Sequence, residues 1–243
     1  MQLHNIKLIG TSHIASQSIK EVEDCILNER PDIVALELDM VRLNALLKGE
    51  QRRVSLADIR RIGFKGYLFI LFGSWVQRKL GAAVGIAPGA EMKAAFRMAR
   101  SMKLKVALID RPIEVTLRRF SSSLSWREKF NFLEDLLRAI FFSRSEARKI
   151  KRDIGLSDLD LSRVPEERLI SYLLKKTEER YPNVYKVLVT ERNHFMAAAL
   201  RRISMNEPDK KILAVVGAGH LKGLEEELKC NSQNHHLQLN SQS

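Results

Sequence analysis

The sequence predicts an α/β fold with a small, mainly parallel central sheet, flanking helices and a helical insertion. Two observations lead to this prediction. Short apolar runs alternate along the chain with longer segments of helical periodicity, which is the order that builds a parallel sheet from crossover units. In addition, each short run is followed within a few residues by an ionisable side chain. The carboxyl ends of parallel strands are where such sheets gather their ligand-binding groups.

The predicted strands are four apolar runs, at residues 7–9, 33–36, 105–109 and 211–216. The second run is continuously apolar, which is typical of a strand buried on both faces. A helix over residues 19–29 lies between the first two strands and ends before Pro31, because proline does not continue a helix. These elements make one crossover unit of a parallel sheet.

The helical insertion is expected over residues 40–100 and 114–182. A further helix begins at Pro182, a residue suited to a first helical turn, and runs to residue 203. A short helix over residues 221–229 follows the last strand. The remaining residues, 231–243, are polar and lack apolar periodicity, so we expect a disordered tail after a single domain of residues 1–230.

The formal net charge of +12 favours anionic partners. Much of the basic character is interleaved with apolar residues at helical spacing, so a solvated helix face and an anionic surface contact are both open interpretations. No nucleic-acid recognition motif is present, and we do not expect nucleic acid as a partner. Residues 66–76 are the most apolar stretch, but they are shorter than the ~20 residues that span a bilayer. They predict a core helix or a membrane-surface helix, and an exposed apolar face there would favour a homo-oligomer.

The expected compartment is the cytoplasm, with peripheral membrane association as an alternative. The chain enters its first strand without a signal peptide or a transmembrane span. Cys25 and Cys230 lie far apart and match no metal-ligand spacing, which indicates a reducing compartment. Cys25 falls on the apolar face of a predicted helix and is expected to be a small buried hydrophobe.

The ends of the predicted strands carry the candidate chemistry. They read Gly10-Thr11-Ser12-His13, Glu37-Leu38-Asp39, Asp110-Arg111 and Gly217-Ala218-Gly219-His220. Two of them share the pattern GxxH, in which a glycine turn places a histidine beside the sheet edge. Neutral imidazole is a good ligand for a divalent transition metal, and Glu37 or Asp39 could complete such a site. The alternative is structural: Asp39 caps the next helix and Glu37 pairs with Arg42.

A second group of polar residues lies in the predicted helix that starts at Pro182. Glu191 falls on its apolar stripe, and a buried carboxylate requires a cation, a metal or a proton. A structural pair with an arginine and a site role are both open. His194 is expected to be a satisfied core or surface histidine rather than a ligand. No strand is followed by GxSxG, a P-loop or GxGxxG, and no helix carries HExxH, so several common enzyme classes lose their usual support.

Six segments together carry a family resemblance: LIGTSHIASQSIKEV, PDIVALELDMVRLNAL, GAEMKAAFRMA, LIDRPIEVTLRR, TERNHFMAAAL and VVGAGHLKGL. In this order they resemble the TraB/PrgY (pheromone-shutdown) family over nearly the whole chain. That family is similar to the TIKI metalloproteases and, more distantly, to erythromycin-esterase-like and ChaN-like proteins.

The resemblance implies an active site containing His13 and His220, with Glu37, Glu191, Arg192 and Asn193 beside them. It implies a metal-dependent hydrolase with manganese or cobalt as the metal, zinc being a further candidate, and a peptide or small molecule as substrate. In this hypothesis His13, His220 and Glu37 hold the metal and its water. Glu191 serves as an acid, a base or a further ligand, and Arg192 with Asn193 stabilises an oxyanion.

The alternative is a regulatory protein that sequesters a signalling peptide or another ligand in the same cleft without catalysis. It uses the same residues but needs no metal. Tight binding without turnover would distinguish it from the hydrolase.

Overall fold

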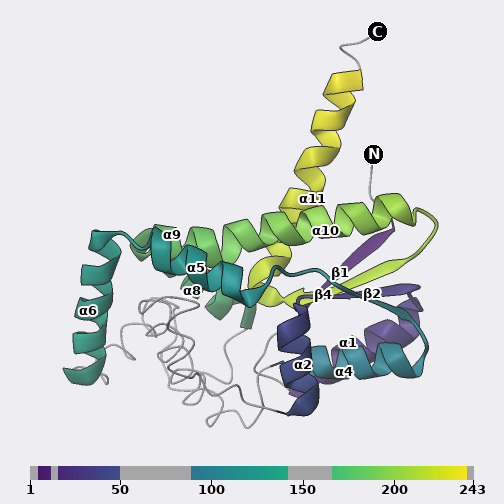
Figure 1. Cartoon of the computed structure of the whole chain (residues 1–243), viewed down its shortest axis with the longest axis horizontal. Coiled ribbons are helices and arrows are strands. Elements are labelled where there is room, and N and C mark those ends of the chain that lie inside the picture. Colours follow the sequence, from purple (N-terminus) through teal and green to yellow (C-terminus); the bar gives the residue numbers. More distant parts are fainter. Residues whose placement is uncertain (1–4, 12–15, 50–88, 142–165, 240–243) are drawn as a thin grey trace.

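The computed structural model confirms an α/β fold with a small parallel sheet and a majority of helix. The structure describes residues 5–11, 16–49, 89–141 and 166–239 (Figure 1). The strands are β1 (Ile6–Thr11), β2 (Ile33–Leu36), β3 (Lys105–Leu108) and β4 (Ile212–Gly217). They form one sheet in the order β1-β4-β2-β3, and each neighbouring pair is parallel. All four predicted strands are present.

The sheet separates two apolar cores, because successive side chains of a strand point to opposite faces. Val34 and Leu36 of β2 lie in one core, whereas Ile33 and Ala35 lie in the other. β2 and β4 are buried along their whole length. Continuous apolar character is therefore required of them, as predicted for residues 33–36.

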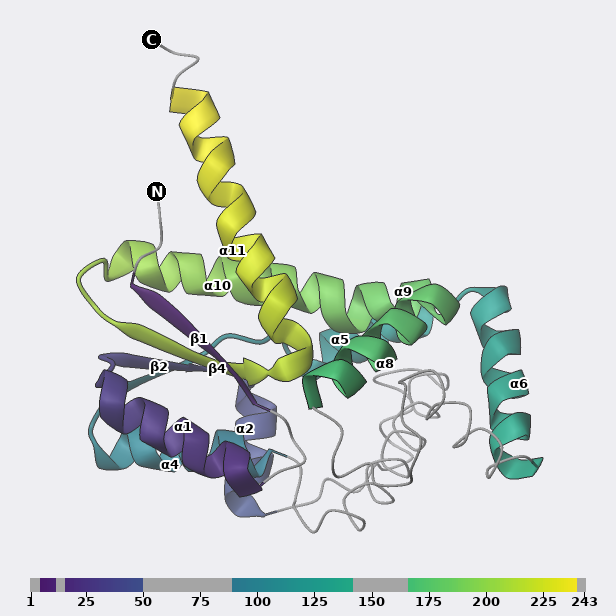
Figure 2. The same ribbon diagram turned by 180° about the vertical axis from the view of Figure 1, so that it is seen from behind.

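Helices from distant parts of the chain cover the two faces. α1 (Ser16–Glu29), α2 (Met40–Lys48) and α4 (Ala90–Ser101) supply side chains to the first core. α10 (Glu191–Asn206) and α11 (Ala218–Leu239) supply side chains to the second. Figures 1 and 2 show α1 and α4 on one side of the sheet and α10 on the other. Cys25 packs partly buried against the first core, as expected for a small hydrophobe.

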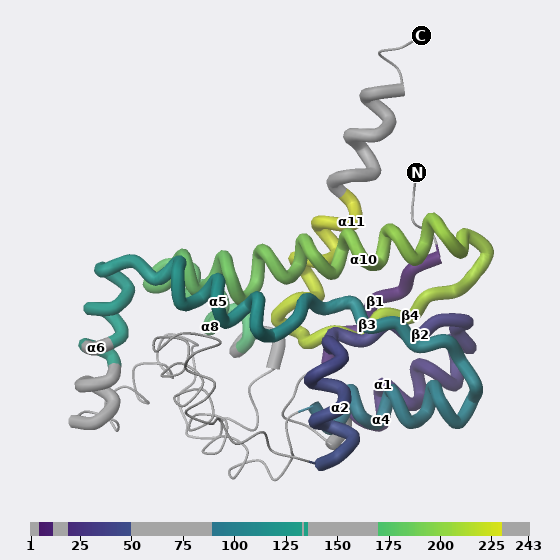
Figure 3. The backbone as a smooth tube through the Cα atoms, viewed as in Figure 1, coloured from purple at the N-terminus to yellow at the C-terminus, as the bar shows by residue number. Residues whose placement is uncertain are grey.

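The predicted helical insertion is described only in part. α5 (Ile113–Ser123), α6 (Trp126–Phe141) and α8 (Glu166–Arg180) are helical as expected, and α5 contacts the segment that leads into α10 (Figure 3). The apolar stretch at residues 66–76 lies outside the described residues. None of the described helices is both long enough and apolar enough to cross a lipid bilayer.

The helix predicted to start at Pro182 is interrupted by a wider turn. The structure divides it into α9 (Pro182–Tyr185), the π-helix η2 (Lys186–Thr190) and α10. The Glu191 N–H donates to the carbonyl of Lys186, five residues earlier. Arg111 donates to the neighbouring carbonyl of Val187 at 2.6 Å, so a side chain from outside the helix engages the widened turn. π-turns of this kind are frequent at functional sites.

The last helix is longer than predicted. We expected helix over residues 221–229 and a disordered tail from residue 231, but α11 runs from Ala218 to Leu239. Leu224 of its first half is fully buried. Once packing has fixed a helical nucleus, each residue added to the helix gains a hydrogen bond without a new nucleation cost. This explains how the helix continues through polar residues that form no apolar stripe.

Candidate functional site

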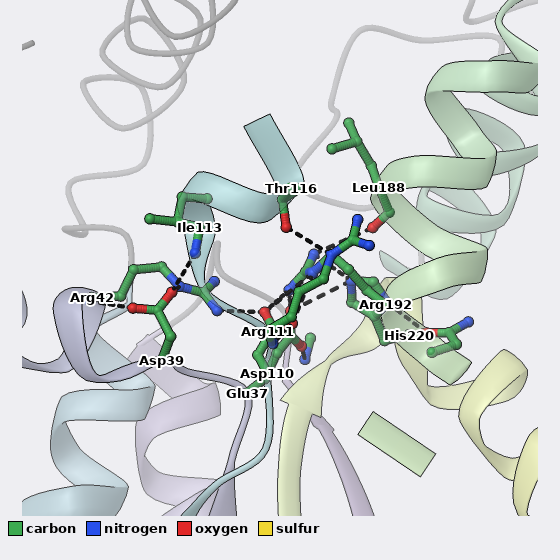
Figure 4. Close-up of polar contacts among 12 residues, drawn as sticks. Glu37, Asp39, Arg42, Asp110, Arg111, Ile113, Thr116, Leu188, Arg192 and His220 are labelled. Atoms are coloured by element: carbon green, nitrogen blue, oxygen red, sulfur yellow. Dashed lines mark hydrogen bonds and ion pairs between the residues drawn. The ribbon is translucent and has the colours of Figure 1, made fainter. Parts of the chain in front are cut away.

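The carboxyl ends of three strands and one helix bring four charged or polar side chains together. Glu37 follows β2, Asp110 lies just beyond β3, His220 follows β4 and Arg192 comes from α10. We call these four residues the Arg192 cluster. Glu37, Asp110 and His220 are all less than a tenth exposed. Figure 4 shows the cluster with the residues that surround it.

Arg192 contacts all three of the other members. Its Nη2 donates to Asp110 Oδ2 at 2.6 Å and also to Glu37 Oε1, and its Nε donates to Asp110 Oδ2 at 3.1 Å. Its Nη1 lies 2.8 Å from His220 Nε2. The planar guanidinium presents several donors in a fixed geometry, which explains how one side chain holds two carboxylates and an imidazole.

The contacts of Glu37 lower the pKa of its carboxyl. Burial raises the pKa of its carboxyl, but a protonated His220, the Arg192 guanidinium and the Gly217 N–H each lower it, and the net direction is downward. Arg192 and Gly217 act in this direction whichever form His220 takes. The Gly217 N–H donates to Glu37 Oε2 at 2.6 Å. The glycine of the second GxxH pattern therefore fixes the carboxylate with its backbone.

Asp110 joins the cluster to a second arginine. Burial raises the pKa of Asp110, but hydrogen bonds and charge from Arg192 and Arg42 more than offset it, and the pKa is lowered. Arg42 Nε also donates to Asp39 Oδ2 at 2.8 Å. Asp39 accepts from the Arg42 N–H as the cap of α2 and from the Ile113 N–H. The alternative reading of Asp39 as a helix cap is confirmed, whereas Glu37 pairs with Arg192 instead of Arg42.

When the His220 ring is neutral, its contacts select one tautomer. All the guanidinium nitrogens of arginine are donors, so a ring nitrogen that faces Arg192 Nη1 must accept a hydrogen bond. Nε2 therefore carries the lone pair and Nδ1 carries the proton. Nδ1 lies 2.6 Å from Asn193 Oδ1, an acceptor. Nε2 is also 3.4 Å from Glu37 Oε1, so the lone pair faces the carboxylates.

Glu191 does not reach the Arg192 cluster. Its carboxylate accepts from Arg111 Nη1 at 2.9 Å and from Arg119 Nε at 3.2 Å. The hydrogen bond from Arg119, with further help from Arg111, lowers the pKa of Glu191 to about 2. Of the two interpretations of this residue, the pair with arginine is what the structure contains. Arg111 also donates to Thr116 Oγ1 at 2.9 Å, so these contacts tie η2 and α10 to α5.

The structure thus gathers Glu37, Arg192, Asn193 and His220 from the set predicted by sequence. His13 lies outside the described residues. His194 is exposed and faces Glu227 with a separation of 3.5 Å between Nδ1 and Oε2, as expected for a surface histidine. Among the residues that the structure describes, no group of three or more His, Cys, Asp or Glu side chains stands close enough together to hold a metal ion.

Two members of the surroundings received no role from the sequence. Asp110 was recognised at a strand end but was assigned no function, and Arg42 was considered only as a partner of Glu37. The signal for Asp110 was its position two residues beyond the end of β3, the strand that pairs with β2. No sequence signal indicated that Arg42 reaches Asp110, since that contact joins residues of different crossover units.

The comparison with known proteins agrees with the resemblance seen in the sequence. Residues 3–231 match the TraB/PrgY/gumN family. The uncharacterized protein MJ1365 of Methanocaldococcus jannaschii is 35% identical over 227 residues, which cover 93% of this chain and 53% of that protein. The TraB domain-containing proteins of Mus musculus and Homo sapiens are each 28% identical, over 90% of this chain and 61% of their own length. The chain therefore spans between half and two thirds of these relatives, and it belongs to the TraB/PrgY/gumN family.

Proposed function

We propose that this chain is a metal-dependent hydrolase of the TraB/TIKI type whose substrates are peptides. One observation carries the proposal. At the carboxyl edge of a parallel sheet, where such folds bind ligands, Glu37 Oε1 and His220 Nε2 lie 3.4 Å apart, both side chains are buried, and both contact Arg192. Buried, interacting ionisable groups with shifted pKa values gather at functional sites, and this supports a reactive site here.

Two of these residues are of types that bind divalent transition metals. Glu37 offers carboxylate oxygens and His220 offers Nε2, and the bond from Nδ1 to Asn193 is the kind of support that metal-bound histidines usually have. Glu37, Asp110 and Asp39 carry three negative charges against two positive charges on Arg192 and Arg42, so the site has an excess of negative charge. We propose that Glu37 and His220 hold the metal together with His13, and that Arg192 Nη1 leaves Nε2 when it binds. The bound metal would polarise a carbonyl and lower the pKa of water.

The chain's own groups supply the rest of the chemistry. Glu37 is ionised and accepts a proton from water at one of its carboxylate oxygens. Asp110 holds Arg192 through Nε and Nη2. Nη1, once it leaves His220, would stabilise the oxyanion that forms when water attacks a peptide carbonyl. Glu191 has no part in these steps, because a carboxyl with a pKa of about 2 is a poor acid near neutral pH.

Hydrolysis of a peptide library tests this proposal. Wild-type protein loaded with manganese, cobalt or zinc should cleave a subset of peptides and lose that activity with chelator. Glu37→Gln and His220→Ala should lose it as well, and His194→Ala, which alters an exposed histidine on α10, should retain it. Equal cleavage by wild type and both site variants would end the assignment.

The second candidate function is sequestration of a peptide by the same residues. The contacts of Arg192 with both Glu37 and His220 favour it, because the guanidinium already offsets the charge of Glu37 and occupies His220 Nε2 without a metal. If the protein sequesters peptides, calorimetric titration with peptides from the same library would show binding without cleavage, and chelator would not change the affinity. Binding that requires the metal would instead support the hydrolase.

A further inference from the structure

The feature that the proposed chemistry does not explain is the packing of Asn193 against Gly223. Asn193 of α10 is buried, and its amide lies where α10 meets α11. A Cβ atom built on Gly223 would stand 2.3 Å from Asn193 Nδ2. The absence of a side chain at residue 223 is therefore what leaves room for the amide.

Asn193 and Arg192 hold opposite edges of one imidazole. Arg192 Nη1 is 2.8 Å from Nε2, and Asn193 Oδ1 is 2.6 Å from Nδ1. A reversed amide would place Nδ2 against Nδ1 and would require the proton on Nε2, where it would oppose the Arg192 donor. Only the Nδ1–H form of the ring satisfies both neighbours.

From these contacts we infer that Asn193, seated against Gly223, is a positioning residue that selects the Nδ1–H tautomer of His220. Its amide keeps the Nε2 lone pair directed at Glu37 and Arg192. This is a different role from the oxyanion contact expected from the sequence. The inference rests on the proposed function only for its effect on turnover, because the tautomer exists whether or not the protein hydrolyses a substrate.

The tautomer can be measured by NMR on the whole 243-residue chain labelled with ¹⁵N-histidine, at a pH where the imidazole is neutral. The chain has six histidines, and the His220 signals are those that disappear in His220→Gln. We expect Nδ1 to be the protonated nitrogen in the wild type. In Asn193→Ala we expect a shift towards the Nε2–H form, which neutral histidine prefers in water. Asn193→Asp, which keeps an acceptor oxygen, should restore the Nδ1–H form.

Gly223→Ala tests the same inference without removing a polar group. The new methyl group displaces the Asn193 amide, so the tautomer should shift as in Asn193→Ala. Gly219→Ala is the matched control in the same helix, because its Cβ would lie at an ordinary distance of 3.8 Å from Leu174. If one variant fails to fold, the other provides the readout. A wild-type ring protonated at Nε2, or an Nδ1–H ring unchanged in the folded variants, would overturn the inference.

Turnover separates this inference from the proposed function. Loss of a residue that supports a metal-bound histidine typically lowers metal affinity or activity by about 10–100-fold, and we expect a loss of this size in Asn193→Ala. If the wild type hydrolyses no peptide, the proposed function is wrong, and the tautomer measurement still tests the role of Asn193. A tautomer unchanged in Asn193→Ala would defeat the inference even if the hydrolase is active.

Discussion

At the scale of single residues, the fold depends on Arg192 because that side chain compensates two buried carboxylates. Glu37 and Asp110 are both nearly inaccessible to water, and each accepts hydrogen bonds from the same guanidinium. Lysine offers a point charge on a flexible stem and does not reproduce this planar set of donors. Arg192 is thus required for the stability of the fold, in addition to its proposed role in stabilising an oxyanion.

Replacing Arg192 by alanine should destabilise the protein by about 3–5 kcal/mol, because the change leaves buried charge without its partner. Urea denaturation followed by circular dichroism measures the difference in unfolding free energy. Arg202→Ala is the matched control, since Arg202 is an exposed arginine of the same helix, and its effect should stay within about 0.5 kcal/mol. Equal losses in the two variants would contradict the pairing described for Arg192.

At the scale of elements, the junction of η2 with α10 and the crossing of α10 with α11 orient the site. The wide turn of η2 changes the direction in which Glu191, Arg192 and Asn193 leave the helix, and no proline or glycine marks it in the sequence. Arg111, from a different part of the chain, donates to the Val187 carbonyl within this turn. A periodicity argument could therefore predict the helix but not the interruption.

The crossing of α10 and α11 predicts a double-mutant effect on stability. Gly223→Ala alone should destabilise the protein by about 1–3 kcal/mol, because the displaced amide leaves the buried Nδ1–H of His220 without an acceptor. In an Asn193→Ala background the same change should stabilise by about 0.5–1 kcal/mol, the ordinary preference of a helix for alanine over glycine. Chemical denaturation of the four proteins measures both values. Additive effects would show that the two residues do not interact.

The contacts of Glu191 predict a pH dependence of stability. In the folded protein the pKa of Glu191 is about 2, below its ordinary value of 4.5, so its ionised form stabilises the fold above pH 4.5 and this contribution is lost as the pH falls towards 2. Glu191→Gln should therefore lower the melting temperature at pH 7, and the gap to the wild type should close in acid. Thermal denaturation across this range measures the gap.

Glu179→Gln is the control for that experiment, because Glu179 is half exposed in a pair with Lys176. Its melting temperature should follow the wild type at every pH. A gap between Glu191→Gln and the wild type that does not change with pH would mean that the ion pairs with Arg111 and Arg119 contribute nothing measurable.

At the scale of the whole molecule, the sheet and the polarity of its edge could be predicted, whereas the partners of the charged residues could not. The apolar composition of residues 33–36 predicts a strand buried on both faces, and the structure has this strand with the same bounds. Glu37 and His220 were placed at one edge because parallel strands share their direction. The choice of Arg192 as partner of Glu37, and of two arginines for Glu191, depends on helix packing across long chain separations.

The two-core arrangement gives a prediction for the molecule as a whole. Leu213 lies in the first core on the strand β4, which pairs with both β1 and β2. Leu213→Ala should cost about 2–5 kcal/mol of unfolding free energy through lost burial and a cavity. Met205→Ala, which alters a side chain that is 57% exposed on α10, should change it by less than about 0.5 kcal/mol. Chemical denaturation compares them, and equal effects would be inconsistent with a core organised about β4.

The metal content of the protein is the measurement that tests the central claim most directly. Protein purified without an affinity tag, as wild type, His220→Ala and His194→Ala, would be loaded with manganese, cobalt or zinc, dialysed and submitted to elemental analysis. The account predicts an equimolar amount of one of these metals in the wild type and in His194→Ala, and its loss in folded His220→Ala. A wild type that retains none of the three, or a His220→Ala protein that retains as much as the wild type, would contradict it.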